Sequence, residues 1–210
     1  MKPKKEQGKR EEGTAKADPL ETNSPVPLKH SSLLPDPITI PRNTLVVLCG
    51  PAGCGKSTFA AKHFKPTEIV SSDECRARLS DDPTNQGVSH HAFELMHFII
   101  KKRLLLERLT VADAMHLESE YRIRLIRIAR WFKFNTAVLA FDIPLEVCLA
   151  RNAARARVVP EEVLRRQHEM FESARDTLDR DGFDHVFILD DEAQSSVILN
   201  IGPPLNRRPA

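Results

Sequence analysis

The sequence lacks the features that mark several protein classes. None of the four cysteines, Cys49, Cys54, Cys75 and Cys148, forms a C-x-x-C pair, which argues against a zinc-binding or thioredoxin-like motif. No apolar run approaches the length of a membrane span, and the N-terminal segment has no apolar stretch typical of a secretory signal. Scattered thiols suit a reducing compartment. We therefore expect a cytoplasmic protein that makes no membrane contact.

The chain also has little net charge. Its formal charge is +2 across 210 residues, so no strong field around the whole molecule draws it to nucleic acid. A polyanionic partner would have to bind a local patch. The hydrophobic content of 41% and the charged content of 29% are typical of a globular protein with a buried core.

Residues 1–43 contain no Phe, Tyr or Trp but hold seven of the 15 prolines. Such a segment buries too little apolar surface to offset the entropy lost on ordering. We predict that it is a disordered, proline-rich extension. Its lysines and arginines are interspersed with acids, which favours a solvated tail over a nucleic-acid contact.

The most informative stretch is Gly50–Ser57, which reads G-x-x-x-x-G-K-S, the phosphate-binding P-loop. A short apolar run, residues 45–49, precedes it, and a sequence compatible with a helix follows. Glycines let backbone N–H groups turn inward on an anion, and the helix offers its positive end to phosphates. Lys56 is expected to reach the β- and γ-phosphates of ATP, and Ser57 to ligate Mg²⁺. The residues expected to contact the nucleotide here are Gly50, Pro51, Ala52, Gly53, Cys54, Gly55, Lys56, Ser57 and Thr58.

Apolar strands and helical segments alternate after residue 44. We expect strands at 44–49, 67–72, 109–112, 136–141 and 185–189, with helices between them. This order predicts an α/β fold with a P-loop kinase-like, parallel five-stranded sheet, helices on both faces and an arginine-bearing helical lid. The predicted organisation is an extension at 1–43, a kinase domain at 44–192 and a C-terminal tail at 193–210. Ligands of such folds bind at the carboxyl ends of the strands.

Two aspartates are expected at those strand ends. Asp73 follows the second strand, where a carboxylate can face the γ-phosphate and accept a proton from an attacking hydroxyl. Arg76 lies three residues later and is a candidate contact for an anionic group of the substrate. Asp113 ends the third strand and is a candidate for holding Mg²⁺ through water. The alternatives are a helix cap for Asp73 and a plain strand-end residue for Asp113.

Arginines form the third feature. Arg151 and Arg155 share a helix face, and the segment that follows resembles a lid that brings arginines to the phosphates. A solvated basic helix is the alternative. Another helix is strongly basic, and a solvated face is the favoured interpretation over nucleic-acid contact; its cations are Arg122, Arg124, Arg127, Arg130 and Lys133. The histidines His90, His91, His97 and His116 show no metal-ligand spacing and are interpreted as ordinary polar residues.

From residue 45 to residue 189 the sequence resembles the kinase domain of the bacterial polynucleotide kinase-phosphatase family, which repairs RNA ends. The matching phrases are Gly50 to Ala60, 62–68, 70–76, 88–103, 109–114 and 151–155. The resemblance implies transfer of the ATP γ-phosphate to a polynucleotide 5′-hydroxyl. It implies Asp73 as the general base, Arg76 as a substrate-phosphate contact, and Arg151 and Arg155 as lid residues, with Lys56, Asp73 and Arg155 catalytic.

The chain departs from that family after the third strand. The family usually reads Asp-Ala-Thr-Asn, whereas this chain reads Asp113-Ala114-Met115-His116. Two rival functions follow: a small-molecule kinase on the same fold, and an ATP-binding module without transferase activity. A nucleic-acid acceptor needs a basic strip that leads to Asp73, and a metabolite acceptor needs a closed pocket.

Overall fold

The computed structural model describes residues 37–155 and 157–205. It confirms the predicted α/β class, with a central sheet of five parallel strands. In spatial order the strands are β3 (Ile69–Ser71), β4 (Thr110–Asp113), β2 (Thr44–Cys49), β5 (Asn135–Phe141) and β6 (His185–Leu189). All six residues of β2 and all seven of β5 are buried, as expected for strands with helices on both faces.

One face of the sheet is covered by two long helices, α3 (Ser89–Leu105) and α4 (Ser119–Trp131). Each turns an apolar stripe inward; Met96 and Ile100 from α3 and Leu125 from α4 are fully buried in one core cluster. At about 25 cal/mol per Å² of apolar surface, such buried side chains contribute roughly 1.5–3 kcal/mol each.

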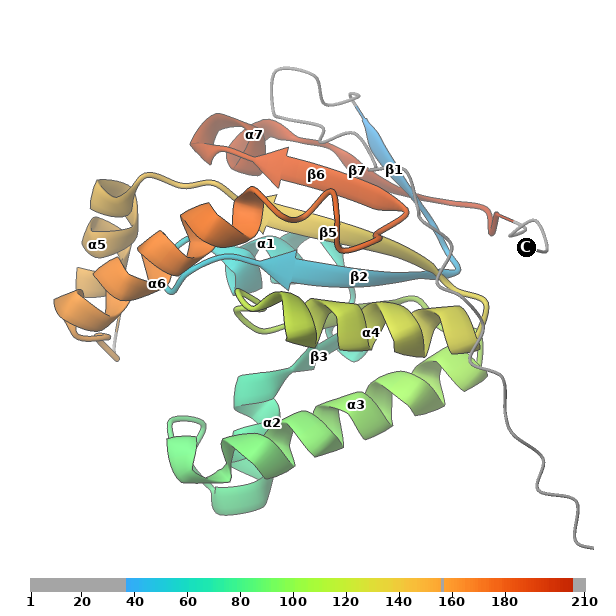
Figure 1. The fold of residues 1–210 in the computed structure, drawn as a ribbon, viewed down its shortest axis with the longest axis horizontal. Coiled ribbons are helices and arrows are strands. Elements are labelled where there is room, and N and C mark those ends of the chain that lie inside the picture. The colour runs from blue at the N-terminus through green and yellow to red at the C-terminus, as the bar shows by residue number, and fades with distance from the viewer. Residues whose placement is uncertain (1–36, 156, 206–210) are drawn as a thin grey trace, which may run out of the picture.

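The other face is covered by α1 (Lys56–His63), which follows the P-loop. Phe59 of α1 packs edge-on against Phe141 of β5, with the ring centroids 5.3 Å apart. Further along the chain, α2 (Ser72–Ser80) follows β3 directly, and α7 (Asp191–Ser196) follows β6. The remaining helices, α5 (Leu145–Ala153) and α6 (Glu161–Arg175), gather at the end of the sheet to which the strand arrowheads point (Figure 1).

The structure corrects both predicted ends of the domain. Residues 38–41, assigned to the disordered extension, form β1 (Ile38–Pro41), and part of the predicted C-terminal tail forms β7 (Leu199–Gly202). The two strands pair in parallel, from Ile38 opposite Leu199 to Pro41 opposite Gly202 (Figure 1). Ile38 and Ile40 are almost fully buried, so these strands belong to the core of the domain. The predicted boundary at residue 193 also cuts through α7. The rest of the predicted extension, residues 1–36, lies outside the described residues.

Among the described residues, no helix is long and apolar enough to cross a membrane. The four cysteines are free and buried.

Candidate active site

The P-loop connects β2 to α1 at the carboxyl end of the sheet. Its backbone requires glycine at two places: Gly53 and Gly55 have φ angles of +78° and +93°, in the left-handed region. A Cβ atom at Gly53 would lie 2.5 Å from the carbonyl oxygen of Cys148. The loop is therefore a tight backbone turn at the N-terminus of α1, the position at which phosphate-binding loops hold an anion.

Lys56 is folded into this loop. Only 8% of the residue is exposed, and its Nζ atom donates hydrogen bonds to the carbonyl oxygens of Gly50 (2.8 Å) and Pro51 (2.7 Å). The ammonium group thus lies against the carbonyl oxygens of the loop. Ser57 and Thr58, the next two residues, are exposed at the start of α1.

Asp113 lies beside the P-loop at the end of β4. Burial raises the pKa of its carboxyl group, while the charge of Lys56 and the Ser57 hydroxyl lower it. A buried carboxylate next to a hydroxyl is a favourable place for a divalent cation, which would offset the cost of burying the negative charge. The strand pairing opposes Asp113 to Ser71 of β3, which brings the end of β3 to the same edge.

Asp73 lies two residues beyond that pairing, in the first turn of α2. The helix is capped by Ser71, whose Oγ atom accepts a hydrogen bond from the backbone N–H of Asp73 at 3.2 Å. The Asp73 side chain is therefore not itself the cap, and 62% of it is exposed. Its charge contributes to raising the pKa of Asp113, as expected for two carboxylates on the same side of the site. An accessible carboxylate thus stands beside the phosphate cradle.

Arg76 is held by protein groups. Its Nη1 atom pairs with Asp73 Oδ1 at 2.5 Å, and its Nε atom donates to Ser89 Oγ at 3.2 Å. Only 9% of the side chain is exposed. In this structure Arg76 orients Asp73 and ties α2 to the start of α3. The contact with a substrate anion, expected from the sequence, stays a prediction.

The helical hairpin of α5 and α6 carries the predicted lid arginines. The side chain of Asn152 closes its turn, because it donates to Val159 O (2.8 Å) and accepts from Val159 N (3.0 Å). Arg155 and Arg157 are exposed on this turn. Hydrogen bonds from Thr84 lower the pKa of Asp82, and the charge of Arg157 adds to that effect, so the turn faces the loop between α2 and α3. The lid role of Arg155 stays a prediction.

Arg151 is engaged differently from Arg155. It pairs with Asp191 (2.5 Å) and donates to Gln194 Oε1 (3.0 Å), both on α7. Gln194 in turn donates to the carbonyl oxygen of Cys54 in the P-loop at 2.7 Å. A second glutamine, Gln167 of α6, accepts a hydrogen bond from Ala52 N at 3.0 Å.

Neither glutamine is among the site residues predicted from the sequence. No local signal marks Gln167, but Asp190-Asp191-Glu192 is a helix-start pattern that predicts α7 and so places Gln194 on a helix.

Met115 and His116, at which the sequence departs from the polynucleotide kinase-phosphatase family, lie in the segment after β4. His116 adopts a φ angle of +46°, which His and Asn tolerate better than most residues. Its buried ring is bonded through Nδ1 to the carbonyl oxygen of Leu48 at 2.8 Å, and Met115 O accepts from Gly50 N at 3.0 Å. This segment therefore supports β2, the strand that leads into the P-loop. His116 is buried and does not lie beside the substrate that would accept the phosphate.

The interpretation of the α4 cations as one solvated face is wrong for Arg122. This side chain is fully buried and pairs with Asp181 at 2.5 Å. It also donates to the carbonyl oxygens of His116 (2.9 Å) and Leu117 (2.7 Å). The physical reason is that Arg122 fixes the segment that braces the P-loop strand. Arg124 and Arg127 are exposed, as expected.

Comparison with known proteins agrees with this geometry. The AAA domain family AAA_33 matches residues 45–174, which contain the P-loop, both strand-end aspartates and α5 with most of α6. The chain belongs to this family. The fold is similar to that of a candidate kinase from Chloroflexus aurantiacus J-10-fl, with a TM-score of 0.51. That likeness has 13% identity and covers 74% of this chain and 88% of the other.

Two further solved structures are similar at lower TM-scores. One is a chain of a Pnkp1/Rnl/Hen1 complex, with 18% identity, a TM-score of 0.46 and coverage of 58% of this chain; this chain spans 42% of that one. The other is an APS kinase from Mycobacterium tuberculosis, with 15% identity, a TM-score of 0.44 and coverage of 73% of this chain and 91% of the other.

Proposed function

We propose that the protein is an ATP- and Mg²⁺-dependent phosphotransferase whose acceptor is the 5′-hydroxyl end of a polynucleotide. The observation that carries the proposal is the position of Asp73. Asp73 and its exposed neighbour Glu74 both contribute to raising the pKa of Asp113, and Asp73 is the one of the two that Arg76 holds in place. A kinase needs a phosphate-binding loop for ATP and, beside it, a group that accepts the proton of the attacking hydroxyl. A module that only binds a nucleotide does not need the proton acceptor.

In the proposed reaction, the acceptor hydroxyl attacks the γ-phosphorus of ATP. A bond forms between that oxygen and the phosphorus, the bond to the β-phosphate oxygen breaks, and ADP leaves. Asp73 orients the hydroxyl and takes its proton. Lys56 exchanges its bonds to the Gly50 and Pro51 carbonyls for phosphate oxygens, and Arg155 approaches the transferring group when the turn of the α5–α6 hairpin closes.

Ser57 and Asp113 fit a magnesium site. Within the described part of the chain, no group of three or more His, Cys, Asp or Glu could form a complete cage for a metal ion. Mg²⁺ in phosphotransferases needs no such cage, because it keeps several waters and binds one or two protein ligands together with phosphates. When bound, the ion neutralises charge on the transferring phosphate. The buried Asp113 carboxylate beside the Ser57 hydroxyl provides the oxygen donors it prefers.

The polynucleotide acceptor is supported by the resemblance at residues 70–76 and 151–155 and by exposed cations at the cavity that Ser89 lines. Arg124 of α4 lines a cavity together with Ser89, the residue to which Arg76 is bonded. Arg124 and Lys101 both lower the pKa of His97 in this cavity, so their positive charges converge on it. Such local charge can attract a phosphate backbone although the net charge of the chain is small.

A small-molecule acceptor is the second candidate. The cavity beside Ser89 has a volume of about 220 Å³, small enough for a metabolite, and it is lined by histidines and a glutamate as well as by aromatic rings. A metabolite kinase on this fold would use the same Asp73 and Lys56.

The deciding experiment offers γ-labelled ATP with 5′-hydroxyl RNA, 5′-hydroxyl DNA and a panel of sugars, nucleosides and hydroxy acids. We expect label at polynucleotide 5′ ends. Lys56→Ala is the negative control and should abolish transfer, because it removes the cation at the phosphates. Label in a metabolite alone would replace the proposed acceptor, and ATP binding without transfer to any acceptor would overturn the phosphotransferase assignment.

A further inference from the structure

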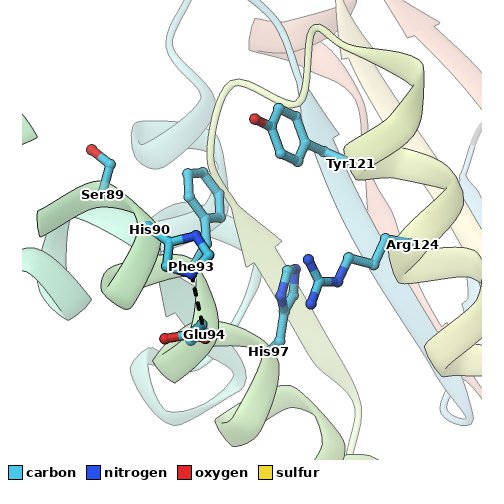
Figure 2. A pocket seen from close by; sticks show the side chains of 7 residues that line it. All are labelled: Ser89, His90, Phe93, Glu94, His97, Tyr121 and Arg124. Carbon is cyan, nitrogen blue, oxygen red and sulfur yellow. Dashed lines mark ion pairs between the residues drawn. The ribbon is translucent and has the colours of Figure 1, made fainter.

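A cavity of about 220 Å³ lies between the N-terminal halves of α3 and α4 (Figure 2). The side chains of His90, Phe93, Glu94 and His97 reach it from α3, and those of Tyr121 and Arg124 from α4. Ser89, at the first position of α3, completes the wall. The P-loop, Lys56 and Asp113 do not line this cavity, so it is separate from the phosphate cradle.

The cavity contains a buried polar atom without a partner. Only 6% of His97 is exposed, and within the described part of the chain its Nδ1 atom has no hydrogen-bond partner. Leaving such an atom unsatisfied is costly, so a polar group that enters the cavity and reaches this nitrogen would gain a hydrogen bond. Burial, with the charges of Arg124 and Lys101, lowers the pKa of His97 to about 4. The ring is therefore neutral near pH 7 and offers one donor and one acceptor nitrogen.

Two aromatic rings give the cavity a shape suited to a flat ligand. Phe93 of α3 and Tyr121 of α4 are stacked with their centroids 5.7 Å apart and their planes within 8° of each other. At this separation the two rings stack on each other, so a planar ligand can lie only on an outer face of the pair. Tyr121 is 39% exposed, which leaves part of it open to a partner. Figure 2 shows Arg124 and His97 facing each other below these rings, so the guanidinium group of Arg124 lies beside the imidazole ring of His97.

The cavity is linked to the proposed catalytic pair through two polar contacts. Ser89 Oγ accepts from Arg76 Nε at 3.2 Å, and Arg76 Nη1 pairs with Asp73 at 2.5 Å. Only Ser89 therefore separates a ligand that fills the cavity from Arg76 and Asp73, the pair that would receive the acceptor hydroxyl.

We propose that this cavity binds the nucleobase of the acceptor's 5′-terminal nucleotide, which stacks on the exposed side of the Tyr121–Phe93 pair and hydrogen-bonds to His97. The inference rests on the proposed function and adds the part of the acceptor that is recognised. A nucleobase combines a flat π-face with edge donors and acceptors, as the two rings and a neutral imidazole require. Arg124 is placed to meet the phosphate that follows this nucleotide.

The test compares kcat/KM for 5′-hydroxyl oligonucleotides that differ only at the first nucleotide, which either carries its base or is abasic. Stacking of one base on aromatic side chains corresponds to roughly a 5- to 150-fold gain in affinity. We expect the wild-type protein to lose kcat/KM by that factor on the abasic end. Tyr121→Ala should lose a similar factor on the end with a base and almost nothing on the abasic end.

Two variants separate recognition from folding. Phe98→Ala removes an exposed aromatic residue of α3 that does not line the cavity, so it should leave kcat/KM unchanged on both substrates. His97→Phe keeps a flat ring but removes the nitrogens. It should lower kcat/KM by roughly 2- to 12-fold only on the end with a base, the effect of one neutral hydrogen bond, without lowering the melting temperature.

The outcomes distinguish the two proposals. Equal wild-type kcat/KM for both ends, or equal losses by Tyr121→Ala on both, would overturn the base site while the kinase function stands. Absence of label from every polynucleotide would overturn the acceptor assignment and the base site with it. A metabolite that becomes labelled and loses kcat/KM with Tyr121→Ala would assign the cavity to that metabolite.

Discussion

Replacing Asp181 by asparagine removes the partner of a fully buried cation. The Arg122 side chain has no exposed surface and that of Asp181 has 3%, so the guanidinium of the variant would keep its charge without a counter-ion. Breaking a buried ion pair on one side costs about 3–5 kcal/mol of unfolding free energy. For a chain of this size each kcal/mol shifts the melting temperature by about 2–4 °C, so we expect a drop of roughly 6–20 °C.

Urea denaturation and thermal unfolding of Asp181→Asn measure this loss. Arg127→Met, an exposed cation on the same helix, is the matched control and should stay within about 0.5 kcal/mol of the wild type. The double variant Arg122→Met/Asp181→Leu should recover part of the loss, because no lone charge remains buried. If Asp181→Asn unfolds like the wild type, Arg122 does not hold the segment beside the P-loop strand in the way described.

Three further predictions concern the lid, a buried histidine and the first strand. Arg155→Ala should lower turnover by roughly 10³-fold with an unchanged melting temperature, measured beside Arg166→Ala, an exposed arginine of α6 that should keep full turnover. Burial lowers the pKa of His116 to about 4, whereas an unfolded histidine titrates near 6.5. Between these two pH values the unfolded chain binds more protons than the folded one. The unfolding free energy should therefore fall as the pH drops from about 6.5 to 4. His116→Asn, which suits the same positive φ, should make that fall shallower, and an unchanged slope would contradict the burial of a neutral ring. A chain that starts at residue 37 should melt like the full chain, whereas one that starts at residue 44 should lose several kcal/mol, because burial of two isoleucines contributes roughly 1.5–3 kcal/mol each; equal melting temperatures would show that β1 adds nothing.

Features encoded by neighbouring residues could be predicted from the sequence. The P-loop is one continuous octet, and the five strands of the sheet are short apolar runs separated by helical segments. Their order alone implies a parallel sheet with its ligand at the carboxyl ends. The positions of Asp73 and Asp113 follow from the same rule, and the structure places both at that edge.

Features that depend on distant partners could not be predicted. β1 and β7 are four-residue strands about 160 positions apart in the sequence, and neither carries a periodic pattern long enough to mark it. Arg122 looks like its exposed neighbours in sequence, but Asp181, 59 residues away, makes it a buried residue. The same holds for Gln194 of α7, since its contact with Cys54 of the P-loop spans 140 residues. Tertiary contacts, not local propensity, decide these cases.

The most direct measurement of the proposed chemistry uses Asp73→Asn and determines ATP affinity and 5′-phosphorylation on the same preparation. The variant keeps size and hydrogen bonding but removes the base, so turnover should fall by roughly 10²–10⁴-fold while ATP affinity changes little. Glu74→Gln, the exposed acid next to it on α2, should keep wild-type turnover. Full turnover of Asp73→Asn would mean that the proton goes elsewhere, and loss of ATP binding with the fold intact would assign Asp73 to the nucleotide site instead of the acceptor.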